Sequence, residues 1–559
     1  MSKSDRNPDR SRKPAEVADS TAKRAPSLAG MLVLGALAAA LVVVLHLASG
    51  SRQSELGAHP DEAAHFVTGL MVRDYLASGF HESPLRYADE YYRHYPKIGL
   101  GVWPPFFYLV QAAWTLVLPP HTVLWLMAVL GLMLAILTGW WLWRAFGWAE
   151  AAAGAAMLTA LPLVQQYSNM VMAEVLSALL MFAATGFFAR YMESDEWRGA
   201  IGFGICAGLA IMTKGTGLAL VFMPALAILF TGRYDLLWRK SLWLAALLAG
   251  LIAGPWTWHF RNQGRGGWEE PSPSLHFTKT AITFYGWEMC VALGWVLAAL
   301  ALAGAVSLFL PGAGRERKPA IAVCSLALVM GVWIFQCLAP VGLEARHLTP
   351  AMPALMVLAM AGLYATTSRW PGVRPIFTWG MLAVFFVWPA VFHPASPTPG
   401  YGSIGNQVAG SPFRVPRKAW GGFEPVAEAV MIKHPTGNIL IASDARGEGM
   451  FIADVAARDP HRPSYTVERA SKILASSTWS GSGYQSLYRT PEEVRAALKK
   501  AQIEFVVTDA SVPIPLAHEK LLTKAVPSMD AMRDPRACVT TAVRDGTATP
   551  GAIVLYAPF

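Results

Sequence analysis

Residues 28–48 read LAGMLVLGALAAALVVVLHLA, an apolar stretch without Lys, Arg, Asp or Glu. A transmembrane helix needs about 20 such residues. The stretch is longer than the apolar core of a cleavable signal peptide, and further apolar runs follow it, so we predict an uncleaved membrane anchor. Residues 1–27 are polar and basic and are predicted to be a disordered cytoplasmic tail.

The composition of the whole chain agrees with this beginning. Its 559 residues are 54% hydrophobic and 15% charged, and the mean hydropathy is +0.36. A soluble protein of this length is less apolar, so we predict a multi-span membrane protein. The net charge of +9 would suit nucleic acid, but the basic residues lie in short clusters between apolar runs. We therefore predict no nucleic-acid partner.

Hydropathy predicts about eleven transmembrane helices, which form an all-α membrane domain over residues 28–393. The predicted spans lie near 28–48, 121–143, 150–168, 171–190, 200–216, 218–231, 241–259, 288–310, 320–340, 349–366 and 375–393. Alternate loops hold the basic residues Arg144, Arg190, Arg198, Arg233, Arg239, Lys240, Arg315, Arg317, Lys318, Arg369 and Arg374. The positive-inside rule places these loops in the cytoplasm, so the N-terminus is cytoplasmic and the first outer loop, residues 49–120, is periplasmic.

The composition changes after His393. Residues 394–416 are rich in Pro, Gly and Ser and are predicted to be a linker. Residues 417–559 are predicted to form a small periplasmic α/β domain, in which Thr490 opens a helix. The expected elements are strands at 438–443 and 503–509 and helices at 447–458 and 491–500. The segment Ser443–Gly449 is either a loop with its helix cap or a ligand site.

Two adjacent carboxylates, Asp61 and Glu62, follow the first span in the segment His59-Pro60-Asp61-Glu62-Ala63-Ala64-His65-Phe66. Ionisable side chains at the mouth of a polytopic protein are candidates for chemistry. The predicted topology places them outside the cell, where nucleotide-activated donors are absent. A transferase there would use a sugar carried on a polyprenyl phosphate. Such a reaction needs a carboxylate base and cations that stabilise the departing phosphate.

Lys214 is the leading candidate for the phosphate, because it interrupts a long apolar stretch on the predicted outer side, where the positive-inside rule disfavours a lysine. The alternative is a lysine that ends a helix and extends to the membrane surface. Arg346 either joins the site or pairs with Glu344. Glu174 either joins the site or stabilises the N-terminus of its helix. Further cations of the outer loops are Arg261, Arg265 and Lys279.

Several of these segments together resemble the type C glycosyltransferases, in particular protein O-mannosyltransferases and lipid A aminoarabinose transferases. They are Asp61-Glu62 with His65-Phe66, Pro104-Pro105-Phe106-Phe107-Tyr108, Thr213-Lys214-Gly215 and Arg346-His347. The resemblance covers about residues 28–393. It implies that Asp61 is the catalytic base, that Glu62 assists it, and that Lys214 lies near the lipid phosphate. It also adds His65 and His347 to the substrate-binding candidates.

Two positions depart from the family pattern. Ala173-Glu174-Val175-Leu176 stands where the family has Asp-Met-Pro-Leu, and Trp103 stands where a lysine often precedes the double proline. The resemblance leaves a divalent metal possible, because only some relatives use one. His59, Asp61, Glu62 and His65 are its candidate ligands.

The predicted function is the inverting transfer of a sugar from a polyprenyl-phosphate donor to a hydroxyl acceptor at the periplasmic face of a bacterial inner membrane. Inversion is expected because a single displacement needs one base. The acceptor can be a protein, lipid A or a polysaccharide, and membrane lipids surround the chain. The alternative is a transporter or flippase, which the lack of an inverted repeat in hydropathy disfavours. A sensor or scaffold would leave the carboxylates unexplained.

Overall fold

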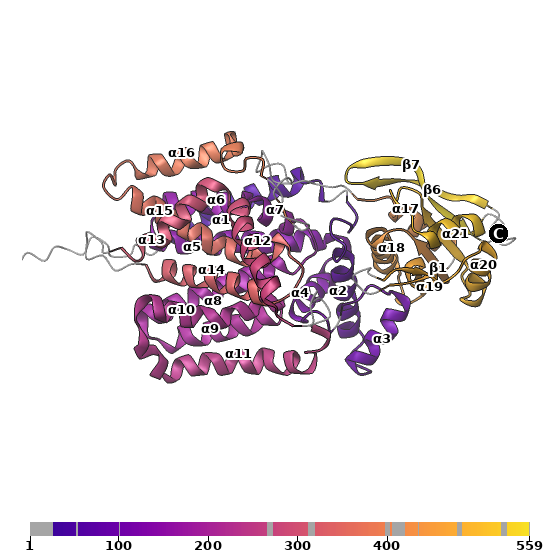
Figure 1. The fold of residues 1–559 in the computed structure, drawn as a ribbon, viewed down its shortest axis with the longest axis horizontal. Helices are drawn as coiled ribbons and strands as arrows, with labels where there is room; N and C mark the ends of the chain where they lie inside the picture. The colour runs from indigo at the N-terminus through magenta and orange to yellow at the C-terminus, as the bar shows by residue number, and fades with distance from the viewer. Residues whose placement is uncertain are drawn as a thin grey trace, which may run out of the picture.

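The computed structural model describes residues 26–51, 54–99, 101–264, 272–310, 319–396, 403–404, 420–433, 435–477, 483–526 and 534–557. A long helical body occupies one end of the molecule, and an α/β domain occupies the other (Figure 1). The predicted fold class is thereby confirmed. Several predicted features lie outside the described residues: the tail up to residue 25, the basic cluster 315–318, Arg265 and most of the linker.

Sixteen α-helices are described before the C-terminal domain, and three of them belong to the first outer loop, residues 49–120. Their bounds are α1 Leu28–Ala48, α2 Glu62–Ala77, α3 Pro84–His94, α4 Phe106–Val117, α5 Val123–Ala145, α6 Trp148–Ala160, α7 Pro162–Ser168, α8 Glu174–Ser194, α9 Trp197–Ile211, α10 Phe222–Thr231, α11 Lys240–His259, α12 Leu275–Leu293, α13 Trp295–Ser307, α14 Ala320–Leu338, α15 Met352–Thr366 and α16 Arg374–Val387. Short 3₁₀ helices join them: η2 Pro120–Thr122, η3 Gly215–Val221, η4 Tyr234–Trp238, η6 Ala345–Ala351 and η7 Pro389–Val391.

Six helical segments in the described residues are long and apolar enough to cross a membrane, and a bent pair raises the number to seven. The six are Leu28–Ala48, Pro120–Ala145, Glu174–Ser194, Lys240–His259, Ala320–Leu338 and Ala345–Thr366. Every predicted span contains a helix, but the others are shorter or interrupted. The count of eleven spans therefore stays a prediction.

Two predicted spans are wrong as continuous helices. The span 288–310 is a pair, α12 and α13, bent by 110°. Gly294 joins the two helices with a φ of 89°, a conformation that favours glycine. Helix α12 also begins earlier than predicted, after Ser274, whose hydroxyl accepts a hydrogen bond from the Phe277 N–H. The span 150–168 is divided between α6 and α7 because Pro162 begins a new helix.

The C-terminal domain contains a five-stranded sheet in the order β2-β1-β5-β7-β6. Strands β1, β2 and β5 are parallel, and the β6–β7 hairpin continues the sheet antiparallel to β5. The elements are α17 Glu424–Lys433, β1 Gly437–Ala442, α18 Ala445–Arg458, β2 Tyr465–Arg469, α19 Ala470–Ile473, β3 Ala475–Ser476, β4 Gln485–Ser486, α20 Pro491–Lys500, β5 Phe505–Asp509, α21 Ala517–Ala525, β6 Asp534–Arg544 and β7 Thr547–Ala557. The four predicted elements are confirmed within three residues, and Thr490 forms the capping box of α20.

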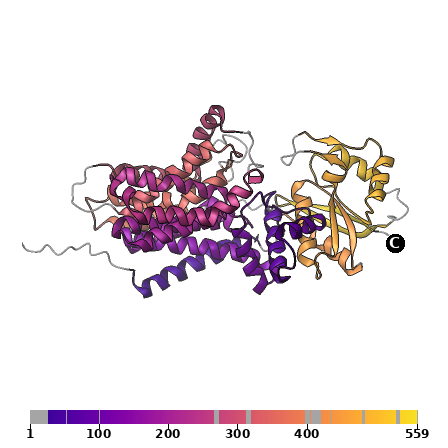
Figure 2. The same cartoon turned by 90° about the horizontal axis from the view of Figure 1, so that it is seen from below.

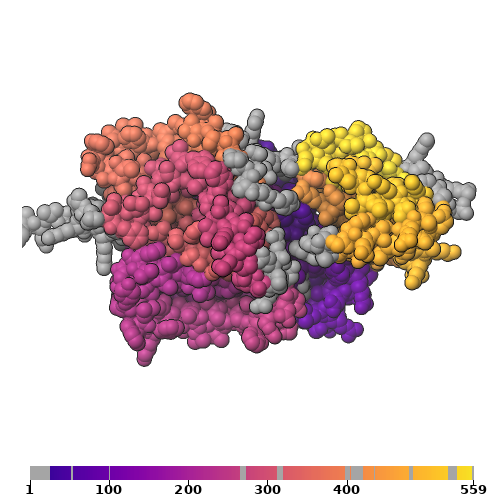
Figure 3. Space-filling model, in the orientation of Figure 1, coloured from indigo at the N-terminus to yellow at the C-terminus, as the bar shows by residue number. Residues whose placement is uncertain are grey.

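The first outer loop lies between the helical body and the C-terminal domain (Figures 1 and 2). Its helices α2 and α3 contact the domain, and α2 packs against α18. In the space-filling view the loop also fills the lower part of the junction between the two bodies (Figure 3). The loop that carries the predicted base is therefore held from both sides.

Glu55 makes the most concentrated contact across this junction. Its carboxylate accepts the backbone N–H groups of Gly422, Phe423 and Glu424 at 2.8 to 3.1 Å. These groups precede or begin helix α17, so a carboxylate of the outer loop caps a helix of the C-terminal domain. Asp74 adds a 2.8 Å ion pair with Arg462. The junction fixes the loop only six residues before Asp61.

Candidate functional site

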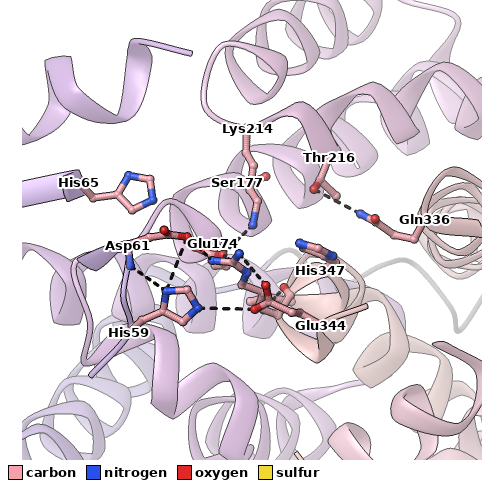
Figure 4. Close-up of polar contacts among 12 residues, drawn as sticks. His59, Asp61, His65, Glu174, Ser177, Lys214, Thr216, Gln336, Glu344 and His347 are labelled. Carbon is pink, nitrogen blue, oxygen red and sulfur yellow. Dashed lines mark hydrogen bonds and ion pairs between the residues drawn. The ribbon is translucent and has the colours of Figure 1, made fainter. Parts of the chain in front are cut away.

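Four segments that are far apart in the chain bring charged side chains together (Figure 4). Asp61 directly precedes α2, and Glu174 is the first residue of α8. Lys214 occupies the turn between α9 and η3, and Arg346 lies in η6. The structure therefore brings together four of the predicted site residues.

Arg346 is the centre of this cluster. Its Nη1 lies 3.2 Å from Oδ2 of Asp61, and its Nη2 lies 2.9 Å from Oε1 of Glu344. Its Nε lies 3.9 Å from Oε1 of Glu174. The predicted pair with Glu344 is thus present, together with a contact to Asp61, and the site role of Arg346 stays a prediction.

Lys214 and Glu174 form the second half of the cluster. Lys214 Nζ donates to Glu174 Oε1 at 2.6 Å. The Glu174 side chain is only 2% exposed. A carboxylate at this depth requires compensating charge, which Lys214 and Arg346 provide from two directions. Glu174 thus stands in a charge network rather than alone at a helix N-terminus.

The cluster has unused hydrogen-bonding capacity. Among the described residues, the buried Glu174 Oε2 and Arg346 Nε atoms have no hydrogen-bond partner. Lys214 carries three N–H donors, and one of them bonds to Glu174. Leaving buried polar atoms unpaired costs about 1–3 kcal/mol for each group. These atoms are the ones that a polar ligand can satisfy.

Asp61 is a carboxylate whose side chain is free of helix capping. Although it stands at the cap position of α2, its side chain makes no capping hydrogen bond. Burial raises the pKa of Asp61, but the nearby His59 and Arg346 outweigh burial, so the pKa lies below the ordinary Asp value. Asp61 is therefore ionised at neutral pH, as a proton acceptor must be.

His59 lies between two acidic side chains of the site, Asp61 and Glu344. Its Nδ1 lies 3.7 Å from Asp61 Oδ2, and its Nε2 lies 3.5 Å from Glu344 Oε2. It also accepts a hydrogen bond from the Asp61 N–H at 3.1 Å. The imidazole therefore contacts Asp61 at its backbone N–H and lies close to its carboxylate.

The Glu62 carboxylate is bonded to two backbone amides, and its expected assisting role beside Asp61 stays a prediction. Its Oε2 accepts the Ala58 N–H and its Oε1 accepts the Val171 N–H, both at 3.0 Å. The carboxylate thereby joins the outer loop to the turn before α8. Because adjacent residues at a helix start point in different directions, Glu62 positions the loop and Asp61 faces the cations.

His65 lies one turn into α2 in an aromatic environment. Its Nδ1 is 2.7 Å from the Tyr108 hydroxyl, and its ring stacks on Trp103 with a centroid distance of 4.2 Å. Burial lowers the pKa of His65 to about 4. The ring is neutral at physiological pH and is held by Tyr108 and Trp103.

The remaining predicted residues differ in position. His347 follows Arg346 and is held by the Tyr285 hydroxyl, 3.0 Å from its Nδ1. Arg261 lies over the Trp258 ring at 4.7 Å, and Lys279 is exposed on α12. Arg265 lies outside the described residues, so its predicted substrate contact stays a prediction.

A divalent metal at the residues that the structure describes stays a prediction. No group of three metal-ligating side chains among them has a suitable arrangement. Asp61 Oδ2 faces the Arg346 guanidinium, and Glu62 is bonded to backbone amides. The cations available for a phosphate here are Lys214 and Arg346.

Two neutral residues beside Lys214, Thr216 and Gln336, were not predicted from the sequence. Gln336 Nε2 lies 3.3 Å from the Thr216 hydroxyl oxygen, and both side chains are buried. Gln336 is a single amide in an apolar span, which is a recognisable signal because polar groups inside membrane helices are costly. Its pairing with Thr216 could not be read from the sequence.

The segment Ser443–Gly449 of the C-terminal domain contains the predicted helix cap. The Asp444 carboxylate accepts the Gly447 N–H at 2.9 Å at the start of α18. Arg544 from β6 pairs with Asp444 and Asp509 at 2.5 Å each and donates to Ser443 at 3.0 Å. An internal guanidinium thus occupies the carboxyl ends of β1 and β5.

The sequence matches one protein-family model, and the structure is similar to solved structures of membrane proteins. Residues 103–259 match the family model described as dolichyl-phosphate-mannose-protein mannosyltransferase. No curated protein matches the sequence. The solved structure of ArnT from Cupriavidus metallidurans bound to undecaprenyl phosphate is similar, with a TM-score of 0.56 and 15% identity, over 95% of this chain and 98% of that chain.

The apo structure of the same ArnT gives a TM-score of 0.54 at 15% identity, again over 95% of this chain and 98% of that chain. At this identity the similarity concerns the fold, and it spans the membrane helices and the C-terminal domain together. The chain therefore shares the fold of ArnT, which agrees with the resemblance to type C glycosyltransferases in its sequence.

Proposed function

We propose that this protein is a membrane glycosyltransferase that moves a sugar from a polyprenyl-phosphate donor to a hydroxyl acceptor. The observation that carries the proposal is the buried chain of contacts from Asp61 through Arg346 and Glu174 to Lys214. It sets an ionised carboxylate beside two cations at the outer ends of membrane helices. The family match and the fold shared with ArnT support the same reaction class.

Lys214 and Arg346 would bind the donor phosphate. Lys214 has N–H donors beyond the one given to Glu174, and Arg346 Nε makes no hydrogen bond among the described residues. When the bond between the anomeric carbon and the phosphate oxygen breaks, its electron pair stays on the phosphate. Positioned cations in a buried site stabilise this developing charge.

Asp61 would act as the general base. The acceptor oxygen forms its bond to the anomeric carbon from the face opposite to the phosphate, and its proton passes to the Asp61 carboxylate. Such a base contributes about 10²–10⁴-fold to the rate. A single displacement of this kind inverts the anomeric configuration. Glu62 and His59 hold the loop and the carboxylate in position.

The distribution of basic loops supports an orientation with the site on the periplasmic face of a bacterial inner membrane. A polyprenyl-linked donor is then presented from the outer leaflet. The acceptor would approach Asp61 at the periplasmic face, where the C-terminal domain also lies against the first outer loop through α18 and α2. Protein, lipid A and polysaccharide hydroxyls all remain compatible with this approach.

The direct test uses purified full-length protein with a synthetic polyprenyl-phosphate sugar and envelope acceptors. We expect consumption of the donor, release of polyprenyl phosphate and a covalent product of inverted anomeric configuration. Accumulation of unmodified substrate inside proteoliposomes, without a covalent product, would instead establish the transporter alternative. Retention of anomeric configuration would overturn the single displacement.

A further inference from the structure

Gln336 is a buried amide with one unused end beside the predicted phosphate site. It lies near the outer end of α14 and is only 1% exposed. Its Nε2 lies 3.3 Å from Thr216 Oγ1, whereas its Oε1 has no partner among the described residues. An unpaired amide oxygen at this depth destabilises the protein unless a ligand or water donates to it.

The position of this oxygen relates it to the donor. Thr216 stands two residues after Lys214, at the first turn of η3, and α14 packs against both η3 and η6. Figure 4 shows Thr216 and Gln336 on the same side of the cluster as Lys214 and His347. The sugar is bonded directly to the phosphate that Lys214 would bind, so the sugar ring would lie close to Lys214.

The unpaired atoms of the site define the chemistry of the ligand. Glu174 Oε2 and Gln336 Oε1 can only accept, and Arg346 Nε can only donate. A ligand that satisfies all three carries hydroxyl donors together with an anionic acceptor. A glycosyl phosphate has this combination, whereas a lipid phosphate without a sugar lacks the donors for the amide.

We propose that Thr216 and Gln336 form a sugar-recognition subsite, in which Gln336 Oε1 accepts a hydrogen bond from a hydroxyl of the transferred sugar and Thr216 holds the amide in place. The inference rests on the proposed function. It adds that the Gln336 amide distinguishes polyprenyl-phosphate sugar from the polyprenyl phosphate left after transfer. The amide also selects for the sugar that places a hydroxyl at this point, because a site built around a hydrogen bond rejects analogues that lack it.

The test compares binding of two probes to full-length protein in nanodiscs: polyprenyl phosphate and polyprenyl-phosphate sugar. Gln336→Leu should weaken binding of the sugar-bearing lipid about tenfold, since one buried hydrogen bond is lost, and leave polyprenyl phosphate unchanged. Thr216→Val should reduce the sugar-bearing affinity in the same direction by a smaller factor. Ser325→Ala on the same helix is the matched control and should change neither.

Deoxy analogues of the sugar identify the contacted hydroxyl. For one deoxy analogue, the affinity of wild-type protein should fall by the same factor as the Gln336→Leu substitution causes with the full sugar. The affinity of Gln336→Leu for that analogue should be no lower than its affinity for the full sugar. Equal weakening of both lipids would place Gln336 at the phosphate and overturn the sugar contact, as would unchanged affinity for the sugar-bearing lipid. Failure of wild-type protein to bind either lipid would instead refute the proposed function, and the subsite with it.

Discussion

Arg346 Nη1 lies 3.2 Å from Asp61 Oδ2, although 285 positions separate the two residues in the chain. One guanidinium thus contacts the predicted base and also approaches Glu174, the partner of Lys214. This contact couples the protonation of Asp61 to the cations that would hold the donor phosphate. A change at Arg346 should therefore alter both functions.

Arg346→Gln should move the acidic limb of the rate profile to higher pH. The active form of Asp61 is the carboxylate, so the rate falls as pH drops through its pKa. Arg346 helps to keep the pKa of Asp61 below its ordinary value, and removing the charge raises the pKa. The kcat of wild-type and variant protein should be measured between pH 4 and 8. Arg346→Lys, which keeps the charge, should restore most of the wild-type limb, and an unmoved limb in Arg346→Gln would contradict the coupling.

Lys214→Met should chiefly weaken donor binding. The variant removes an ammonium that pairs with the buried Glu174 and would contact the phosphate, so the KM for polyprenyl-phosphate sugar should rise about 10- to 100-fold. Because Lys214→Met leaves the Glu174 carboxylate without its lysine partner, the double variant Lys214→Met/Glu174→Gln should be measured as well. Lys279→Met, at an exposed position on α12, is the control. A donor KM equal to that of wild type would exclude the phosphate role.

His65→Phe should flatten the dependence of stability on pH. Burial lowers the pKa of His65 in the folded protein to about 4. In the unfolded chain the pKa is about 6.5, so between these two pH values the unfolded chain binds a proton that the folded protein does not bind. Its contribution to stability is present above pH 6.5 and is lost as pH falls from 6.5 toward 4, by up to about 3 kcal/mol. Thermal unfolding in detergent at pH 7 and pH 4.5 would show the difference. His81→Phe, exposed in the same loop, should retain the wild-type slope.

Glu55→Gln should loosen the start of helix α17. The substitution replaces a charged acceptor of three backbone N–H groups by a neutral one, and loss of a helix cap costs about 0.5–2 kcal/mol. Hydrogen–deuterium exchange of residues 422–424 should become several-fold faster. Glu428→Gln, on the exposed side of α17, should leave exchange unchanged. Identical exchange in both variants would mean that other contacts hold the domain.

The sequence predicted the positions of helices well because hydropathy and capping residues act locally. Thr490 with its capping box and the apolar run Leu28–Ala48 are examples. The bend between α12 and α13 could not be predicted, because hydropathy continues through Gly294 while its φ of 89° does not follow from composition. The cap that Glu55 provides for α17 joins residues more than 360 positions apart.

The site was predictable where a residue contradicts its surroundings. Asp61 follows a membrane helix, and Lys214 interrupts an apolar stretch on the side where lysine is disfavoured. Glu62 looked equivalent to Asp61, and only the three-dimensional structure separates them, by the Ala58 and Val171 amides that Glu62 accepts. The contact between His59 and Glu344 joins residues far apart in the chain, so it could not be predicted from their spacing in the sequence.

The most direct test of the account is the turnover of a synthetic polyprenyl-phosphate sugar by Asp61→Asn. The amide keeps the shape of the side chain but cannot accept the acceptor's proton, so kcat should fall at least about 100-fold, while donor affinity and thermal unfolding stay near wild type. Asp89→Asn, on the exposed face of α3, is the matched control. Wild-type turnover in Asp61→Asn would contradict the assignment of Asp61 as the base.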